Sequence, residues 1–295
     1  MSDKTNLRQA DAKAVTVGTV SDKKLEITTE NGVRRIEGTV TIKTSPTNFV
    51  QWKVNCAEKT KAGEDNKTFA GMMTVFNEYK SIADVGEDEA DVVRVTGQIN
   101  PFRSRNGNEI ISYLGKFFTR IKNGQEIEPK AEFEVELYIK SLVPEMNKDG
   151  EETGRYKIIG WMPTFAGIEP VELIVPEELA SAVEDNYEPK QTAKFYGNIV
   201  QNVTYTVIDK QLAFGVRKET QSNFINELVV TGGTVHYDDE PTGENDDKKN
   251  IPYDPTVIQA AIEERDREIQ EKQNKPTTTT NAKPSGASRG RTLGW

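Results

Sequence analysis

The residues between positions 100 and 122 carry the side chains with the most informative chemistry. The cations of this segment are Arg103, Arg105, Lys116, Arg120 and Lys122, and the aromatic residues between them are Phe102, Tyr113, Phe117 and Phe118. The bases of a single-stranded nucleic acid stack on aromatic rings, each stack contributing about 1–3 kcal/mol, while cations follow the phosphates. The segment therefore predicts a surface for single-stranded nucleic acid.

Core packing is the alternative role for some of these aromatic residues. Alternation along residues 109–121 puts Tyr113 and Phe117 on one face of a predicted strand, and Leu114 and Phe118 on the other. One face of a half-buried strand belongs to the core. We keep Tyr113 as a contact candidate, with core placement as its alternative, and we expect Phe102, which has polar loop neighbours, to face the ligand.

Other predicted strands add further contact candidates. Trp52 shares an apolar face with Val50 and is expected inside, so Lys53 is the candidate on that strand. Trp161 is retained as a candidate, with core placement as its alternative. The remaining candidates are Lys43, Arg94, Tyr138, Lys140, Lys157, Lys194 and Tyr196.

The sequence gives little support for a catalytic or metal-binding site. The chain has one cysteine, Cys56, and one histidine, His236, which excludes a disulfide framework, a Cys-based zinc site and a multi-His metal centre. No carboxylate spacing marks an acid–base pair, and Gly232-Gly233 indicates a turn rather than a phosphate-binding loop. We expect a protein that is not an enzyme and holds no cofactor or metal.

The elements that must position these side chains are β-strands, and their pattern occurs twice. Residues 91–99 match residues 191–199 at an offset of about 100, with Gly97 over Gly197. Residues 35–43 are likewise echoed by residues 132–140. Both pairs show the period-two alternation of a strand with one apolar face.

Each copy has the same predicted order of elements between these anchors. Further strands are expected over 49–56, 67–76 and 109–121 in the first copy, and over 156–162 and 168–175 in the second. Short helical links are expected over 81–90 and 176–186. The second copy is expected to close less regularly, through residues 205–207, 212–216 and 227–237.

Strand, strand, strand, helix, strand, strand is the order of an OB-fold, a small Greek-key barrel. We therefore predict an all-β protein of two tandem OB-like five-stranded barrels with a short C-terminal helix and a disordered tail. A repeated β-sandwich is the alternative.

The composition changes after the second copy. Six acids and no base fall in residues 238–247 (Asp238, Asp239, Glu240, Glu244, Asp246 and Asp247). Asp254-Pro255 then supplies a helix N-cap and first-turn proline. The expected organisation is a flexible N-terminus at 1–13, barrels at 14–127 and 128–237, an acidic linker at 238–254, a helix at 255–274 and a disordered basic tail at 275–295.

The overall charge limits any nucleic-acid surface to a local one. The 295 residues carry a formal charge of -9, with 29% charged and 35% hydrophobic residues. A nucleic-acid-binding domain is usually basic. The sequence shows no apolar run long enough for a membrane span and no secretory signal at its start. The expected location is cytoplasmic, in the host cell if the protein is phage-encoded.

The strand at 92–99, the loop at 100–108 and the strand at 109–121 resemble the OB-fold single-stranded DNA-binding proteins of tailed bacteriophages. By pattern, the resemblance covers roughly residues 14–254. Asn250-Ile251-Pro252-Tyr253, after the acidic run, is similar to the acidic Ile-Pro-Phe-type tail with which such proteins recruit replication partners. The resemblance thus implies that Ile251, Pro252 and Tyr253 bind a partner.

The sequence departs from that family at its end, where a helix and a basic tail ending in Trp295 follow the acidic segment. The tail is a candidate for contacting DNA or a partner, or for folding back on the acidic linker. The predicted function is sequence-tolerant binding of single-stranded DNA in replication, recombination or repair. The alternative is a phage structural or assembly protein of two β-barrel or sandwich modules.

Overall fold

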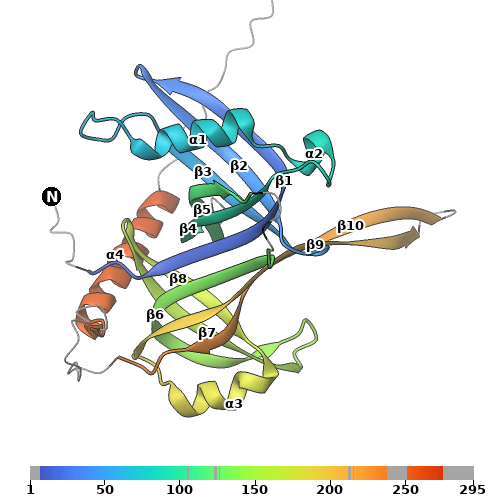
Figure 1. Cartoon of the computed structure of the whole chain (residues 1–295). Coiled ribbons are helices and arrows are strands. Elements are labelled where there is room, and N and C mark those ends of the chain that lie inside the picture. The colour runs from blue at the N-terminus through green and yellow to red at the C-terminus, as the bar shows by residue number, and fades with distance from the viewer. Residues whose placement is uncertain are drawn as a thin grey trace, which may run out of the picture.

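The computed structural model describes residues 7–104, 106–122, 125, 127–211, 214, 216–237 and 251–274. Arg105, Trp295 and the basic tail, all named above, lie outside these residues. The described part consists mainly of β-strands that form two barrels side by side (Figure 1).

The first barrel is a closed ring of five strands. They are β1 (Ala12–Glu30), β2 (Val33–Lys43), β3 (Phe49–Ala57), β4 (Val92–Arg103) and β5 (Glu109–Arg120). Their order is β2-β3-β5-β4-β1, and β1 pairs back onto β2 to close the ring. β3 and β5 run parallel, whereas the other neighbours are antiparallel. Along the chain, three strands, a helical stretch and two strands follow one another, which is the predicted order of elements, although the first three strands are β1, β2 and β3.

The second barrel repeats the same connections. Its strands are β6 (Lys130–Met146), β7 (Glu152–Thr164), β8 (Gly167–Val175), β9 (Thr192–Gln211) and β10 (Val216–Gly233). They follow the order β6-β7-β8-β10-β9, and β9 pairs with β6 to close the ring. β8 and β10 are the parallel pair. The prediction of an all-β protein with two tandem five-stranded barrels is confirmed.

Alternating side chains account for the strands and for where the core lies. Along β3, Val50 and Trp52 are fully buried, whereas Gln51 is exposed and Lys53 half-buried. The indole N–H of Trp52 donates to the hydroxyl of Thr16 at 2.9 Å, so its polar group is paired inside the barrel. The prediction that Trp52 is a core residue is confirmed.

One of the predicted strands in the first copy is wrong. Residues 67–76 form helix α1 (Lys67–Glu78), not a strand. Its buried side chains Phe69, Met72 and Val75 recur at helical spacing, and Asn66 caps its first turn by accepting from the backbone N–H of Thr68. A helix with one apolar face fits the end of the barrel, where a strand would have no neighbour to pair with.

The strand missed by the sequence pattern is β1, and this shifts part of the repeat. β1 pairs with β4 and β6 through its first half and with β2 through its polar second half, after an irregularity between Val20 and Asp22. Residues 35–43 therefore form the second strand of their barrel, whereas residues 132–140 lie in the first strand of theirs. Residues 91–99 and 191–199, by contrast, lie on the equivalent strands β4 and β9.

Three further helices complete the described chain: α2 (Ile82–Val85), α3 (Glu177–Asn186) and α4 (Pro255–Asn274). α4 begins as predicted, with the carboxylate of Asp254 accepting from the backbone N–H of Thr256 at 2.7 Å. It lies along the outside of the second barrel, beside β8 (Figure 1). No helix among the described residues has the length and apolar character that crossing a bilayer requires.

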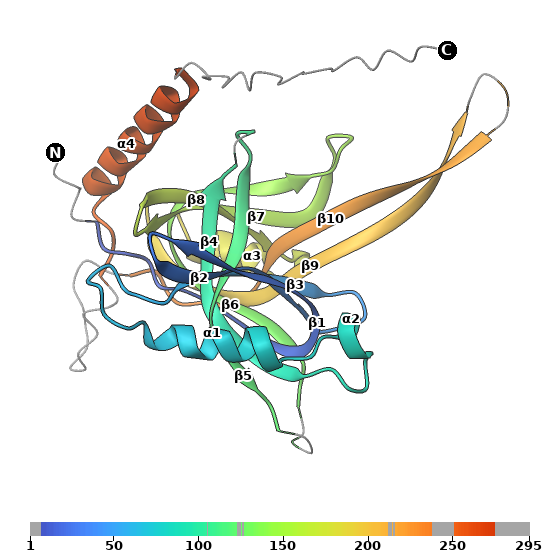
Figure 2. The ribbon, with the colours of Figure 1, turned by 90° about the horizontal axis from the view of Figure 1, so that it is seen from above.

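β9 and β10 extend beyond the second barrel as a two-stranded arm (Figure 2). Their pairing runs from Phe195 opposite Gly233 out to Gln211 opposite Val216. The expected irregular closure of the second copy is thus one long hairpin.

The base of the arm is held by the first barrel. The amide of Asn226 donates to the carbonyl of Ile111 at 2.8 Å and accepts from the hydroxyl of Tyr113 at 3.1 Å. The side chain of Asn48 accepts from the backbone N–H of Gln201 at 2.7 Å. These bonds and the pairing of β1 with β6 fix the two barrels relative to each other.

Candidate nucleic-acid interface

The outward row of β4 forms the centre of the candidate interface. Alternate residues of this strand, Arg94, Gln98, Asn100 and Phe102, point away from the core. Cation, amide and aromatic side chains thus lie in one line on the surface of the first barrel. Thr96 lies in the same row, and the stretch from Thr96 to Phe102 is six residue steps long, about 20 Å of extended strand.

One end of this row carries a cation stacked on an aromatic ring. The ammonium of Lys53, on β3, lies 4.1 Å from the centre of the Phe102 ring. Such a contact contributes about 0.5–1 kcal/mol at an exposed site. Arg103, next along the chain, is paired with Glu109 at 3.1 Å. The predicted contact residues Lys53, Phe102 and Arg103 therefore lie together on one end of the β4–β5 hairpin.

The other end of the row combines an exposed ring with exposed cations. Phe117 lies directly opposite Thr96, and 58% of its surface is exposed. Arg94 and Lys116 are both exposed next to this pair. Within the described part of the chain, neither cation has an acidic partner within ion-pair distance. Phe117, Arg94 and Lys116 therefore offer a stacking ring and two available positive charges.

A hollow next to Arg94 adds to the positive charge. It is lined by Val17, Arg94, Thr119, Arg120, Ile121, Lys122, Gln125, Ile127 and Glu128. Three of these residues are cations and one is an acid. Arg120 is paired with Asp91 at 2.8 Å and lies over the ring of Tyr79, which leaves Arg94 and Lys122 as the hollow's more available charges.

Tyr113 does not belong to this surface, and its prediction as a contact residue is wrong. Its ring is fully buried, 5.8 Å from that of Trp52. Burial raises the pKa of its hydroxyl above the ordinary value. The register of β4 and β5 shifts between Gly97 and Thr96, which face Gly115 and Phe117. This bulge reverses the alternation, so Tyr113 points inward and Phe117 outward.

Phe117 is not among the named contact candidates, although unbroken alternation along the strand puts it on the same face as Tyr113. Alternation alone therefore cannot show that the two rings face opposite sides. The available signal is Gly115, since an isolated glycine inside a strand pattern indicates a bulge or a close backbone approach. With a bulge at Gly115, the same sequence predicts that Phe117 faces solvent.

Three predicted cations are neutralised by nearby carboxylates. Lys43 pairs with Glu87 at 2.5 Å, and Lys157 pairs with Glu172 at 2.8 Å. Lys194 lies 2.9 Å from Glu134 and 3.1 Å from Asp11, with 15% of its side chain exposed. Burial alone would lower the pKa of Lys194, but its bonds to these two acids outweigh burial and raise it. Such paired cations have less charge to offer a phosphate.

The aromatic candidates of the second barrel are mostly covered. Tyr138 points away from the barrel core but is only 7% exposed, because Tyr253 and helix α4 pack over it. The predicted outward direction of Tyr138 is therefore correct, but in this docked conformation the side chain is covered and not accessible. Trp161 lies opposite Tyr138 and packs at the edge of the same cluster. Tyr196, on β9, remains 39% exposed.

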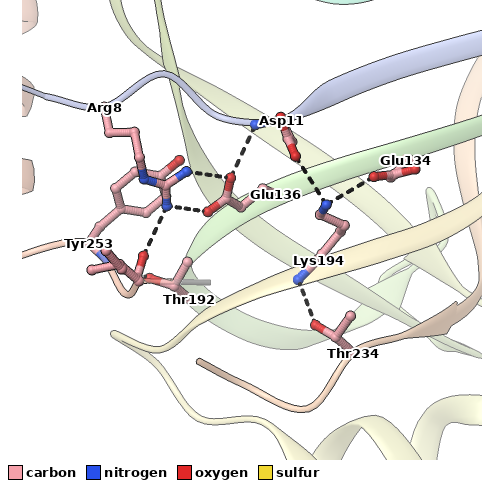
Figure 3. Close-up of polar contacts among 9 residues, drawn as sticks. Arg8, Asp11, Glu134, Glu136, Thr192, Lys194, Thr234 and Tyr253 are labelled. Carbon is pink, nitrogen blue, oxygen red and sulfur yellow. Dashed lines mark hydrogen bonds and ion pairs between the residues drawn. The ribbon is translucent and has the colours of Figure 1, made fainter. Parts of the chain in front are cut away.

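The segment predicted to bind a partner is docked on its own chain (Figure 3). The guanidinium of Arg8 donates to Glu136 at 2.9 Å and to the carbonyl of Ile251 at 2.9 Å, and lies 4.6 Å over the ring of Tyr253. The backbone N–H of Tyr253 donates to the hydroxyl of Thr192 at 3.0 Å. Burial, followed by the charge of Glu136, raises the pKa of the Tyr253 hydroxyl.

This docking corrects the predicted availability of the segment. Tyr253 is only 5% exposed and Pro252 is half-buried, whereas Ile251 is 48% exposed. Glu136 is 1% exposed on its side chain and is held by Arg8 and by the backbone N–H of Asp11. A buried carboxylate without such partners would be costly. In this conformation, Tyr253 is not accessible to another protein.

Two solved structures are similar in fold. The wild-type single-stranded DNA-binding protein from Thermus aquaticus is 8% identical, with a TM-score of 0.46 over 81% of this chain and 97% of that one. A deletion mutant of the Thermus aquaticus protein is 10% identical, with a TM-score of 0.45 over 80% of this chain and 99% of that one. No curated protein matches this sequence significantly. A family model described as YorF matches residues 11–275, and the chain therefore belongs to the YorF family.

Proposed function

We propose that this protein binds single-stranded DNA without strong sequence preference and without catalysing a reaction. The setting we propose is DNA replication, recombination or repair, in the host cytoplasm if a bacteriophage encodes the chain. The observation that carries the proposal is the exposed ring of Phe117 beside Arg94 and Lys116. A ring and two cations that form no ion pair with an acid among the described residues supply the stacking and the phosphate contacts that single-stranded DNA requires.

The outward row of β4 gives this DNA a path. It leads from Arg94 and Phe117, past the amides of Gln98 and Asn100, to Phe102 and Lys53. Amide side chains can hydrogen-bond to any base edge or phosphate, and stacking accepts every base. The path therefore supports binding that tolerates different sequences.

The face of strands two and three is another surface that OB-folds use for oligonucleotides. In the first barrel this face carries Gln51, Lys53 and Asn55, which point outward from β3. Lys53 belongs to both surfaces, since it also lies on the ring of Phe102. The proposed path thus continues from the β4–β5 hairpin onto β3.

Replacement of Phe117 by alanine tests the proposal. We expect Phe117→Ala to weaken binding of fluorescein-labelled oligo-dT by about 1–3 kcal/mol, the contribution of one stacked base. Phe165→Ala is the matched control, because Phe165 is 78% exposed on the turn between β7 and β8. Fluorescence anisotropy titration gives both affinities.

The control is expected to bind like the wild type. Equal effects of the two alanine substitutions, or no effect of either, would contradict the proposed path. Titrations with duplex DNA and with oligo-U as competitors measure the preference for single strands and for DNA over RNA.

A structural or assembly role is the second candidate, and the arm favours it. Val203 and Phe224 face each other across the arm and are 41% and 60% exposed, and Phe214 near its tip is 92% exposed. Exposed apolar residues on a two-stranded ribbon suit contacts with another protein. Light scattering over a range of protein concentrations tests this role. A defined oligomer that dissociates in the Phe224→Ser variant would support assembly.

A further inference from the structure

The two barrels are built alike but differ in what covers the face of their second and third strands. In the first barrel, Gln51 and Asn55 on β3 are exposed on this face. In the second barrel the equivalent strands are β7 and β8. Helix α4 lies beside β8 (Figure 1), and its buried side chains belong to the cluster against which Trp161 of β7 packs. The duplication therefore presents one open and one covered copy of the same surface.

The covered surface contains the side chains of a stacking site. Tyr138 and Trp161 lie opposite each other on β6 and β7. The ammonium of Lys140 lies 5.5 Å from the centre of the Trp161 ring. Ile258 and Ala261 of α4, which are 1% and 5% exposed, pack into the same cluster. The helix thus occupies the place that a base would take on these rings.

Arg265 fastens α4 to both barrels. Its guanidinium lies 2.7 Å from Glu109 on β5 and 2.9 Å from Glu169 on β8, and 5.7 Å from the centre of the Trp161 ring. Glu109 also pairs with Arg103, a residue of the proposed DNA path. The helix therefore bridges the end of that path in the first barrel and the covered face of the second.

The segment before α4 is also attached to the second barrel. It is held by Arg8 and Thr192, through the backbone of Ile251 and Tyr253 (Figure 3). The other side of the helix exposes the acids Glu263, Asp266 and Glu271 and the cation Arg267, which leaves an excess of negative charge there. Negative charge over this face opposes the approach of phosphates for as long as the helix stays docked.

We propose that α4 is an intramolecular cover that competes with single-stranded DNA for the Trp161 face of the second barrel. This inference rests on the proposed function. When α4 is docked, only the first barrel binds DNA, and when α4 is displaced, the strand continues onto Trp161, Tyr138 and Lys140. Binding that requires a fraction of open molecules is weakened by that fraction, so releasing the helix strengthens it.

Two substitutions in one turn of α4 separate the release of the helix from its added charge. Ile258→Asp puts a carboxylate into the buried contact, whereas Ala260→Asp puts the same charge on the exposed side. A new negative charge by itself weakens DNA binding, so tighter binding by Ile258→Asp cannot arise from charge. The two variants and the wild-type reference all carry Trp295→Phe, which leaves Trp161 and the fully buried Trp52 as the tryptophans.

Acrylamide quenching without DNA reports whether the helix has left Trp161, and anisotropy titration with oligo-dT reports the affinity. We expect Ile258→Asp to increase quenching and to tighten oligo-dT binding by on the order of tenfold. Ala260→Asp should match the wild type in quenching and gain no affinity. Adding Trp161→Ala to Ile258→Asp should remove the gain in affinity.

Increased quenching without tighter binding would contradict the proposal that α4 competes with DNA, and would leave the proposed function intact. Quenching at the wild-type level would show that α4 is not displaceable, and would also contradict that proposal. If no form of the protein, wild type included, binds oligo-dT, the proposed function itself fails. If Ile258→Asp no longer unfolds cooperatively, Arg265→Ala, which removes both ion pairs, is tested for the same two changes.

Discussion

Tyr113 and Phe117 lie four residues apart on β5 and face opposite sides of the barrel wall. The bulge at Gly115 separates them, so that one ring packs against Trp52 and the other is 58% exposed. Both side chains are aromatic rings, and they differ in role because one is buried and the other is exposed. We infer that Tyr113 holds the barrels together through Asn226, whereas Phe117 contacts DNA.

Replacing Tyr113 by phenylalanine tests this division. Tyr113→Phe leaves the side-chain oxygen of Asn226 without its donor, and we expect the free energy of unfolding to fall by about 1–2 kcal/mol. Urea unfolding measures this change. Oligo-dT affinity should stay at the wild-type value. Weaker DNA binding by a fully stable Tyr113→Phe would mean that the hydroxyl contacts the ligand.

At the scale of elements, Gly97 and Gly197 show how far the duplication extends. A Cβ atom at Gly97 would lie 2.1 Å from the carbonyl oxygen of Leu114, and one at Gly197 would lie 2.0 Å from that of Val229. Each glycine lets the fourth strand of its barrel approach the fifth closely. The sequence match of residues 91–99 with 191–199 therefore reflects a shared steric requirement.

Substitution at Gly97 gives this requirement a measurable cost. Gly97→Ala should lower the free energy of unfolding by about 1–3 kcal/mol, because the new methyl group overpacks the contact between β4 and β5. Gly232→Ala is the control, since a Cβ atom there meets nothing within 4 Å. Thermal or urea unfolding compares the two. A Gly97→Ala protein as stable as the control would contradict the close approach.

Local patterns are sufficient to predict some elements and insufficient for others. β3 alternates strictly and α4 begins at Asp254-Pro255, so both can be predicted. β1 cannot, because its second half is polar and is held by pairing with β2. α1 is not predicted correctly, although Phe69, Met72 and Val75 at helical spacing and the N-cap Asn66 are signals of a helix in the sequence.

The candidate site divides in the same way. The cation and the ring of Lys53 and Phe102 can be predicted from residue type, and the structure brings them within 4.1 Å. The burial of Tyr138 and Tyr253 cannot be predicted from the sequence, because it depends on contacts of Arg8 with Glu136 and with the segment around Ile251. Contacts over such separations leave no periodic trace in the sequence.

At the scale of the whole molecule, the charge of -9 is the feature that a DNA-binding account must explain. Several cations outside the path are paired with acids, as Lys157 is with Glu172 and Lys194 with Glu134. The proposed path concentrates the available charge at Lys53, Arg94 and Lys116. DNA would therefore contact a narrow positive stripe on an acidic body, and few phosphates would be neutralised.

The salt dependence of oligo-dT binding tests this account most directly. With about three phosphate contacts, the logarithm of the association constant should fall with the logarithm of salt concentration with a slope of about −2. Anisotropy titrations between about 50 and about 200 mM salt measure this slope. We expect binding at the lower concentration that weakens on this slope as salt is added. No binding at low salt, or binding that salt does not change, would contradict it.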